Sequence, residues 1–254
     1  DLGLPEVSSA IDLAILERMS ATVPRLGSTA GWHVQFGREL NATDDRGAFV
    51  PATHAASARC VLEGKQIEPF RVDVAASRSE LRVDAEAGSK VPRRARLAYR
   101  DVASATNRLT LIAAIVPARA VTTHTLFVLR TQMPLQRQHT LCALLNSFVA
   151  NYLIRMRVST HVTAALMSRL PVPLPDPKTA ERLADLAAAL SSATEPIDAM
   201  PEYAELQAIV ARLHGLNRTA RSLRRLSTSL RAAGFDADIW SYPSRRYGLP
   251  DLVG

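Results

Sequence analysis

The triplet Glu63-Gly64-Lys65 is a short pattern whose residue types could carry out catalysis. It has the Glu-x-Lys form of a metal-dependent nuclease, and Asp44 or Asp45 upstream offers a second carboxylate. Two carboxylates and a lysine can hold Mg²⁺ and orient a water molecule for attack on a phosphodiester. Such a short triplet also occurs by chance in many chains of this length. A Mg²⁺-dependent nuclease that uses Glu63 and Lys65 is therefore kept as an alternative.

Other motifs for catalysis and cofactor binding are absent from the sequence. It has no Gly-x-x-x-x-Gly-Lys or Gly-x-Gly-x-x-Gly loop for phosphates, and no Gly-x-Ser-x-Gly turn for a serine nucleophile. The histidines never fall at His-x-x-x-His spacing, and Cys60 and Cys142 belong to no paired motif, so no metal site is predicted. Because Pro-Pro does not occur, the Asn-Pro-Pro-Tyr loop of a DNA amino-methyltransferase is excluded from these residues.

The overall composition is that of an ordinary folded protein. The chain has 254 residues, of which 47% are apolar and 22% charged, and its formal net charge is +7. This length fits one large domain, or one domain with an appendage, and the composition argues against disorder. The longest apolar run, residues 109–116, is too short to cross a membrane, and no secretion leader is visible. We therefore expect a soluble cytoplasmic protein.

The N-terminal part of the chain changes from a helical to a strand-like pattern. A helix over residues 8–22 is predicted, because apolar residues recur there at helical spacing after a serine cap. From residue 31 to about 131 the sequence consists of short apolar runs broken by Gly, Pro, Asp and Asn, which is typical of strands. A mixed, largely antiparallel sheet is expected. The predicted strands are 32–36, 59–62, 96–99, 109–116 and 124–129.

Helices are predicted for most of the remaining chain. Apolar residues at i, i+3, i+4 and i+7 predict one long core helix over residues 135–157. Four prolines within residues 171–177 forbid a helix there and form a stiff connector. After the connector, helices are predicted at 177–194, 201–214 and 216–233. The expected fold class is α+β, with a helical entry (1–30), an α+β domain (31–175) and an all-helical C-terminal region (176–254).

Arginine supplies most of the positive charge. Lysine occupies three positions, so arginine accounts for 28 of the 31 basic residues. Residues 78–108 carry eight basic side chains against four acidic ones, and residues 212–246 carry eight arginines against two aspartates. Arginine is well suited to bind phosphates and guanine edges, but a solvated surface carries such charges too. Composition leaves both interpretations open.

Short motifs follow one another in a fixed order between about residues 32 and 173. They are Phe36–Thr43 with Asp45, Leu62–Ile67, Tyr99–Ala103 with Asn107–Thr110, Ile115–Pro117, Leu144–Ser147, Tyr152–Arg155 and Leu170–Pro173. Together they resemble the TaqI-like C-terminal specificity domain, the target recognition domain attached to adenine-N6 DNA methyltransferases. This domain occurs in fused type II restriction-modification enzymes and in phage-defence methylases. In that family the Glu-Gly-Lys segment belongs to the recognition fold, which argues against the nuclease.

The resemblance implies a function in choosing DNA targets. This chain would recognise a double-stranded DNA sequence for an adenine-N6 methyltransferase in restriction-modification or phage defence. The catalytic domain, which would bind S-adenosylmethionine, is expected upstream in a longer protein or on a partner chain, because no methylase core is present here. No cofactor is expected in this chain, and no membrane partner. The rival hypothesis is a protein-interaction module that holds a defence complex together, which the helices after residue 177 would suit.

The resemblance and the distribution of charge together nominate DNA-binding residues. Arginine and lysine contacts to phosphates set the register, whereas polar side chains beside loops read base edges. The candidates for phosphate contacts are Lys65, Arg93, Arg94 and Arg96. The candidates for base reading are Arg71, Arg100, Asn107, Arg108, Thr123 and His124. Two alternatives stay open: Asp101 could form a structural ion pair with Arg100 or Arg108, and His124 could only cap a strand.

Overall fold

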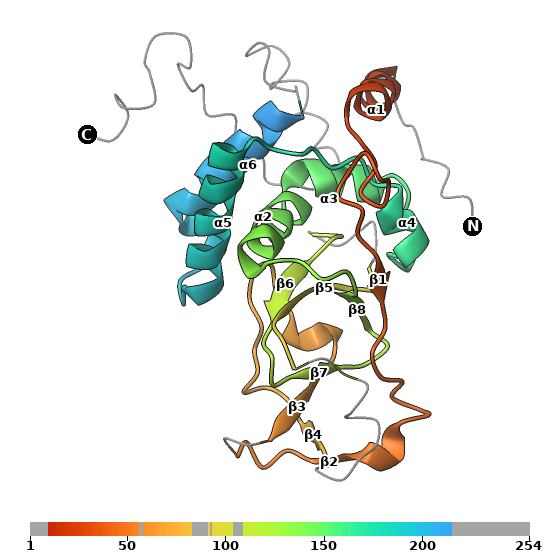
Figure 1. Ribbon diagram of the computed structural model, residues 1–254, viewed down its shortest axis with the longest axis vertical. Helices are drawn as coiled ribbons and strands as arrows, with labels where there is room; N and C mark the ends of the chain where they lie inside the picture. The colour runs from red at the N-terminus through yellow and green to blue at the C-terminus, as the bar shows by residue number, and fades with distance from the viewer. Residues whose placement is uncertain (1–9, 56–57, 83–90, 92, 104–108, 215–254) are drawn as a thin grey trace.

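The described part of the protein is built in layers. A computed structural model describes residues 10–55, 58–82, 91, 93–103 and 109–214. Helices gather at one end, a four-stranded sheet lies in the middle, and a second four-stranded sheet lies at the opposite end (Figure 1). Both sheets are mostly antiparallel, so the predicted α+β class is confirmed.

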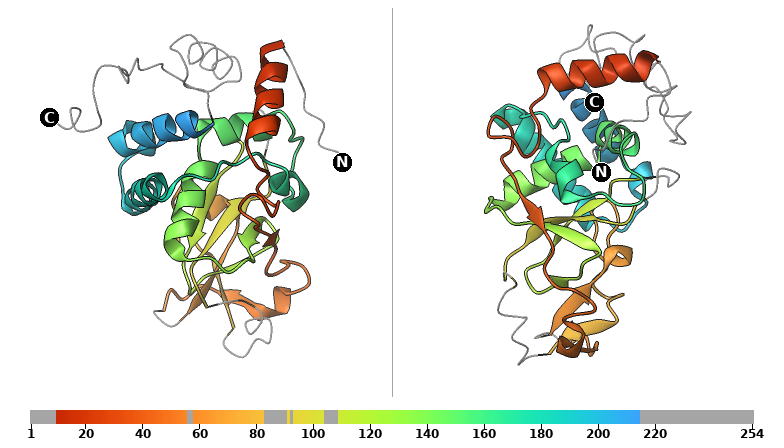
Figure 2. Two further views of the ribbon diagram at one scale, coloured as in Figure 1. Left: turned by 45° about the horizontal axis from the view of Figure 1, so that its top comes forward. Right: turned by 90° about the vertical axis from the view of Figure 1, so that its right-hand side faces the viewer.

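The first helix ties the N-terminal part of the chain to the helical layer. Helix α1 spans Ala10–Thr22, close to the predicted range, and buries Leu16 and Met19, which lie one turn apart. Asp12 is also buried and accepts a hydrogen bond from the Tyr152 hydroxyl. Figure 2 shows α1 at the end of the molecule away from the second sheet.

Sheet 1 is the central layer, in the order β1-β8-β5-β6, with every neighbouring pair antiparallel. Its strands are β1 (Phe36–Gly37), β5 (Arg96–Arg100), β6 (Ala113–Val116) and β8 (Leu126–Leu129). Side chains alternate across β5, so Leu97 and Tyr99 join the core under the helices while Ala98 packs with Leu62 and Ile67 on the other face. Both faces of this sheet are therefore covered.

Sheet 2 is smaller and has the order β2-β4-β3-β7, with β3 and β7 as a parallel pair. Its strands are β2 (Phe49–Pro51), β3 (Arg59–Leu62), β4 (Ser79–Leu81) and β7 (Val121–Thr122). Its own core consists of a few buried side chains, which are Leu40, Val61, Leu81, Val91 and Val121. Only β3 was predicted, because runs of two or three residues give no recognisable alternation.

The predicted long core helix over 135–157 is wrong in one respect. The structure has two helices, α2 (Leu135–Leu145) and α3 (Phe148–Arg155). The break falls at Asn146 and Ser147, whose side chains form other hydrogen bonds: Asn146 pairs with the backbone of Ala113 in β6, and Ser147 accepts from Ala150 N as the N-cap of α3. Asn and Ser compete with the helical backbone in this way, and periodicity alone does not show it.

The remaining described helices complete the layer above sheet 1. They are α4 (Ala164–Ser168), α5 (Pro177–Ser192) and α6 (Pro201–Leu213). Helix α5 begins as predicted after the proline-rich connector, with Asp176 as its N-cap and Pro177 in its first turn. One apolar core joins the helices to sheet 1 and includes residues on both sides of position 175, such as Leu141 and Leu183. The predicted helix over 216–233 lies outside the described residues.

Helices α1 to α6 are between 5 and 16 residues long. Over the described ranges, none of them combines the length and the apolar character that a bilayer crossing needs.

Candidate nucleic-acid interface

A turn at residues 123–125 connects the two sheets and several loops. Thr123 N donates a hydrogen bond to Leu62 O (3.0 Å), and Asp101 N donates to Thr125 O (3.0 Å). Gly64 N donates to Thr125 Oγ1 (2.9 Å), which brings the Glu63-Gly64-Lys65 triplet onto the same turn. His124 Nδ1 accepts from Ala42 N at 3.3 Å. The turn therefore fixes the end of β5, the end of β3 and the loop before β2 relative to one another.

Four of the predicted DNA-binding residues meet at this turn: Lys65, Arg100, Thr123 and His124. A Cβ added to Gly64 would lie 3.6 Å from Thr125 O and 3.8 Å from Arg100 Cγ, so the backbone before Lys65 passes close to the Arg100 side chain. Thr123 is buried, with its Oγ1 3.1 Å from Thr125 Oγ1, and therefore shapes the turn. The sequence predicted these four separately, and the structure brings them together.

Arg100 and Lys65 have side chains available to a ligand. The Arg100 side chain is half-buried, and its enclosed Nε has no hydrogen-bond partner among the described residues. Burial lowers the pKa of Arg100 from its ordinary value, and the nearby Glu68 carboxylate partly opposes this shift. Lys65 is exposed, with its Nζ 2.6 Å from Glu63 Oε2. Because the Nε is enclosed, only the outer part of the half-buried guanidinium is in a position to meet an acceptor such as a phosphate or a base edge.

A cavity of about 540 Å³ opens beside the turn, on the face of sheet 2 that carries Val61. Among the described residues that line it, the basic ones are Arg46, Lys65 and Arg78, and the acidic one is Glu63. Among the described residues, Arg46 and Arg78 form no ion pair. The sequence prediction did not include these two arginines, and no local motif singles them out from the other arginines.

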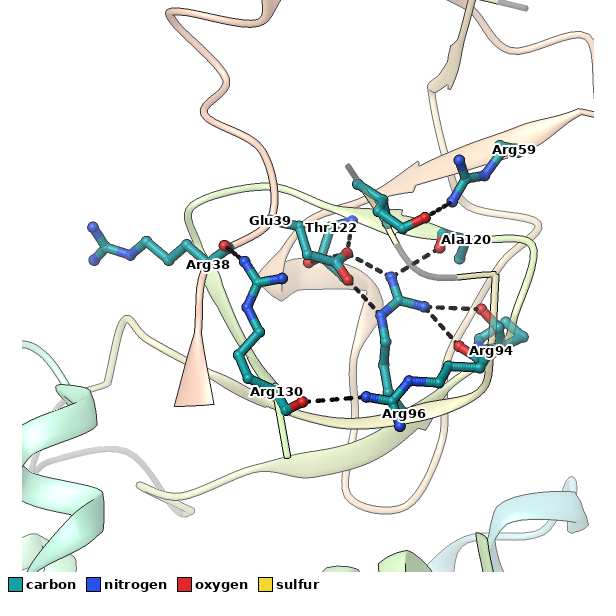
Figure 3. Close-up of polar contacts among 10 residues, drawn as sticks. Arg38, Glu39, Arg59, Arg94, Arg96, Ala120, Thr122 and Arg130 are labelled. Atoms are coloured by element: carbon teal, nitrogen blue, oxygen red, sulfur yellow. Dashed lines mark hydrogen bonds and ion pairs between the residues drawn. The ribbon is translucent and has the colours of Figure 1, made fainter. Parts of the chain in front are cut away.

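A second basic region surrounds Glu39 (Figure 3). The Arg96 guanidinium forms a bidentate ion pair with the Glu39 carboxylate, at 2.5 Å for both Nε–Oε1 and Nη2–Oε2. The side chains of Arg96 and Glu39 are 1% and 0% exposed. Arg96 also donates to Ala120 O (3.0 Å) and Arg94 O (3.1 Å), and Thr122 donates to Glu39 through both its amide and its hydroxyl. The predicted phosphate contact of Arg96 is therefore corrected to a structural role, because its donors are occupied and buried.

Other arginines border this ion pair and stay nearer to solvent. Arg94 Nη2 donates to Arg130 O at 3.3 Å, and Arg130 in turn donates to Arg38 O. Burial and the positive charges of Arg93 and Arg96 lower the pKa of Arg59 from its ordinary value. Arg93 is exposed. Of the three arginines predicted here, Arg93 and Arg94 thus remain accessible for phosphate contacts.

Arg71 does not lie at the turn. Its Nε donates to Leu190 O at 3.1 Å and its Nη2 to Glu195 O at 2.5 Å, so its side chain binds carbonyls at the C-terminal end of α5. The predicted base contact of Arg71 is therefore corrected to a role in packing α5 against the loop before β4. Asn107 and Arg108, the other two predicted base-reading residues, lie outside the described residues.

Asp101 has partners that the sequence did not suggest. Its carboxylate pairs with Arg38 Nη2 at 2.8 Å and lies 3.4 Å from His161 Nδ1. The Arg38 guanidinium also lies 4.8 Å from the centre of the Phe127 ring. The alternative that Asp101 pairs with Arg100 is therefore wrong, and Arg100 is left for other partners.

The Glu63-Gly64-Lys65 triplet has a structural explanation. Glu63 is the N-cap of the short helix η2 (Gly64–Gln66), and Glu63 and Gln66 form a reciprocal capping box. Within the described ranges, no group of three His, Cys, Asp or Glu side chains lies close enough to hold a metal ion. Asp44 and Asp45 instead accept hydrogen bonds from the side-chain amide and the backbone amide of Asn41.

Comparisons with known proteins give a fold relationship. No protein-family model and no curated protein matches this chain. Its fold is similar to part of the type IIL restriction-modification enzyme MmeI, which was solved in complex with DNA. The TM-score is 0.52 at 13% sequence identity, over 79% of this chain. The chain spans 35% of the length of the MmeI chain. At this identity the similarity concerns the architecture of the two chains.

Proposed function

We propose that this chain is the target recognition domain of a restriction-modification or phage-defence system, and that it selects sites in double-stranded DNA for an adenine-N6 methyltransferase. The observation that carries the proposal is the meeting of Lys65, Arg100, Thr123 and His124 at one turn. The similarity of the fold to part of a restriction-modification enzyme solved with DNA supports it. The motif resemblance supplies the adenine-N6 methyltransferase, with S-adenosylmethionine bound by a catalytic domain in cis or on a partner chain.

The residues divide into two roles in this mechanism. Lys65, Arg93 and Arg94 contact phosphates, which sets the register on the duplex and makes binding depend on salt. Arg100 reads a base edge from the end of β5, because its fork of donors fits the two acceptors of guanine in the major groove. His124 reads from the adjoining turn. The recognition domain would hold the duplex while the catalytic domain flips the target adenine, at a cost of a few kcal/mol.

The first experiment measures duplex binding by the purified chain. Selection from a random duplex pool identifies the preferred sequence, and fluorescence anisotropy then gives its affinity at 50 and 200 mM salt. A recognition domain with about six phosphate contacts should lose affinity by roughly 10³ over this range. Binding that is weak, independent of sequence and insensitive to salt would contradict the proposal.

Variants then separate base reading from phosphate contact. Arg100→Ala should cost about 1–3 kcal/mol on the preferred duplex and relax specificity at one base pair. Lys65→Ala should weaken all duplexes alike and reduce the salt slope by about 1. Arg182→Ala is the matched control, because Arg182 is exposed on α5 and pairs with Glu205 on α6. If Arg100→Ala changed affinity no more than Arg182→Ala does, the assignment of Arg100 would be wrong.

The methyltransferase part of the proposal needs a separate test. The full-length protein, or this chain with its partner, is incubated with the selected duplex and radiolabelled S-adenosylmethionine. Label should enter adenine at N6, and Arg100→Ala should spread it to related sites. An absence of label in adenine would overturn this part while leaving DNA recognition in place.

A protein-interaction module is the second candidate, and one observation favours it. Leu13 in α1, Leu135 in α2 and Leu174 in the proline-rich connector are 48%, 48% and 45% exposed, so each of these elements presents one large apolar side chain to solvent. A protein that only joins partners would show no salt-dependent preference among duplexes. The selection experiment therefore distinguishes the two candidates directly.

A further inference from the structure

The cavity beside the 123–125 turn combines two chemical environments. Its charged side chains are Arg46, Lys65, Arg78 and Glu63, and its apolar wall includes Phe49, Pro51 and Val61. Its volume of about 540 Å³ falls in the range of roughly 300–1,000 Å³ that is usual for small-molecule sites. A groove that only followed a DNA backbone would need the charges but not the apolar wall.

The arginines of this cavity are not used by the fold. Arg46 lies in the short helix η1 (Arg46–Ala48), and Arg78 immediately precedes β4. Both are exposed, and among the described residues neither forms an ion pair. Together with Lys65 they give three basic side chains against one carboxylate, that of Glu63, in the described part of the lining. A ligand with at least one phosphate group would balance this charge.

Glu63 adds a hydrogen-bond acceptor for a planar ligand. One of its oxygens, Oε2, accepts from Lys65 Nζ at 2.6 Å, and the carboxylate also caps η2. An ionised carboxylate has about four acceptor positions on its two oxygens, so it keeps capacity for an N–H donor from a ligand. The exocyclic amino groups of adenine, cytosine and guanine are such donors, and an unpaired thymine offers its ring N3–H instead.

We propose that this cavity binds a single nucleotide outside a base-paired stack, with its phosphate on Arg46 and Arg78 and its base against the apolar wall and Glu63. The inference rests on the proposed function in one respect, because it places the nucleotide in DNA held by this domain. The same chemistry would also accept a free deoxynucleoside monophosphate. The experiment therefore has an arm for each source.

The first arm compares three duplexes of the same sequence, which are fully paired, carry one unpaired adenosine, or carry one unpaired abasic residue. The abasic duplex has the same additional phosphate but no base, so the comparison isolates the base. Stacking against a protein surface is worth enough to expect at least about a fivefold tighter affinity for the unpaired adenosine than for the abasic residue.

Two variants fill the cavity from different sides. Ser79→Leu acts from β4 and Ala42→Leu from the loop before η1, and both residues line the cavity. Each should abolish the preference for the unpaired adenosine while leaving affinity for the paired duplex within about twofold. Thermal melting shows whether each variant is folded, and Arg182→Ala again provides the control. A preference that survives in both folded variants would overturn the inference.

The second arm uses deoxyadenosine 5′-monophosphate alone. If the mononucleotide competes with the adenosine-containing duplex, and if Ser79→Leu removes this competition, the nucleotide site in the cavity is supported. If the mononucleotide binds more tightly than the duplex does, the cavity is assigned to free nucleotides. Equal affinity for the adenosine and abasic duplexes, together with strong binding of the paired duplex, would overturn this inference and leave the proposed function standing. Failure to bind any duplex and any mononucleotide would overturn both.

Discussion

Two basic regions of this molecule look alike in the sequence and differ in the structure. Around Glu39, Arg96 is buried and its guanidinium donates to a carboxylate and to backbone carbonyls. Around the cavity, Arg46 and Arg78 are exposed and, among the described residues, form no ion pair. The first region needs its arginine for folding, and the second holds arginines that the fold does not use.

The difference shows that a binding surface is distinguished from a structural network by the hydrogen-bond and ion-pair partners of its arginines, and not by the number of its charges. A buried ion pair is stable only when all its hydrogen-bonding groups are satisfied, which leaves nothing for a ligand. An arginine at an open cavity keeps its five donors. Accounting for donors and acceptors therefore assigns Arg96 to the fold and Arg46 to a surface, although both are arginines close to strands.

The largest expected effect concerns the buried ion pair between Glu39 and Arg96. Glu39→Gln leaves the Arg96 charge buried without its counter-ion, so the free energy of unfolding should fall by about 3–5 kcal/mol. Urea unfolding measures this change. Combining Glu39→Gln with Arg96→Met removes the uncompensated charge and should recover part of the loss. A decrease below about 1 kcal/mol for Glu39→Gln alone would contradict the structural role of the pair.

The same comparison explains which site residues could be predicted from the sequence and which could not. Arg100, Thr123 and His124 were predicted to lie beside loops, and the ends of strands bring them to one turn together with Lys65. Arg71 and Arg96 were misassigned because their partners are distant in sequence: Leu190 is 119 residues from Arg71, and Glu39 is 57 residues from Arg96. No local pattern encodes such a pairing.

The prediction of secondary structure was likewise accurate where the signals are local and inaccurate where distant residues decide. Helices α1 and α5 and strand β3 were predicted well, because periodicity, caps and β-branched residues are local signals. The predicted strand over 109–116 is shorter in the structure and begins at Ala113. The backbone amides of Thr110 and Leu111 donate to Asn151 Oδ1 from α3, so a side chain replaces a neighbouring strand there. Tertiary contacts of this kind decide where elements end.

The next expected effect concerns a buried ionisable group in the helical layer. His214 follows α6 with its Nδ1 2.8 Å from Val210 O, and burial lowers its pKa from 6.5 to about 4. Below pH 6.5 the unfolded chain binds a proton that the folded chain does not, so stability falls as the pH drops toward 4. The slope should be on the order of 1 kcal/mol per pH unit.

Unfolding at several pH values tests this expectation against His214→Gln, which cannot titrate. The two proteins should diverge as the pH falls from 6.5 to 4, with the natural sequence losing more stability. Parallel curves over that interval would mean that His214 is protonated equally in both states. The buried region would then tolerate an additional charge, which would weaken the contrast with the open cavity.

A smaller effect is expected where a buried polar side chain serves the backbone. Asn151→Ala removes the acceptor for the amides of Thr110 and Leu111, and buried unsatisfied donors cost about 1–3 kcal/mol. Hydrogen exchange should show faster exchange at both amides. Gln132→Ala, at an exposed position, is the control and should stay within about 0.5 kcal/mol. Unchanged exchange at Thr110 and Leu111 would show that another group replaces Asn151.

The smallest expected effect on the free energy of unfolding concerns Arg46 and Arg78 at the cavity. Arg46→Ala and Arg78→Ala remove exposed side chains without ion pairs among the described residues, so each should change the free energy of unfolding by less than about 0.5 kcal/mol. If they contact phosphates, each substitution should reduce the slope of log affinity against log salt by about 1. A loss of stability comparable to that of Glu39→Gln would mean that these arginines also belong to the fold. The distinction between occupied and available arginines therefore depends on two measurements made on the same variants, urea unfolding and the salt dependence of duplex binding.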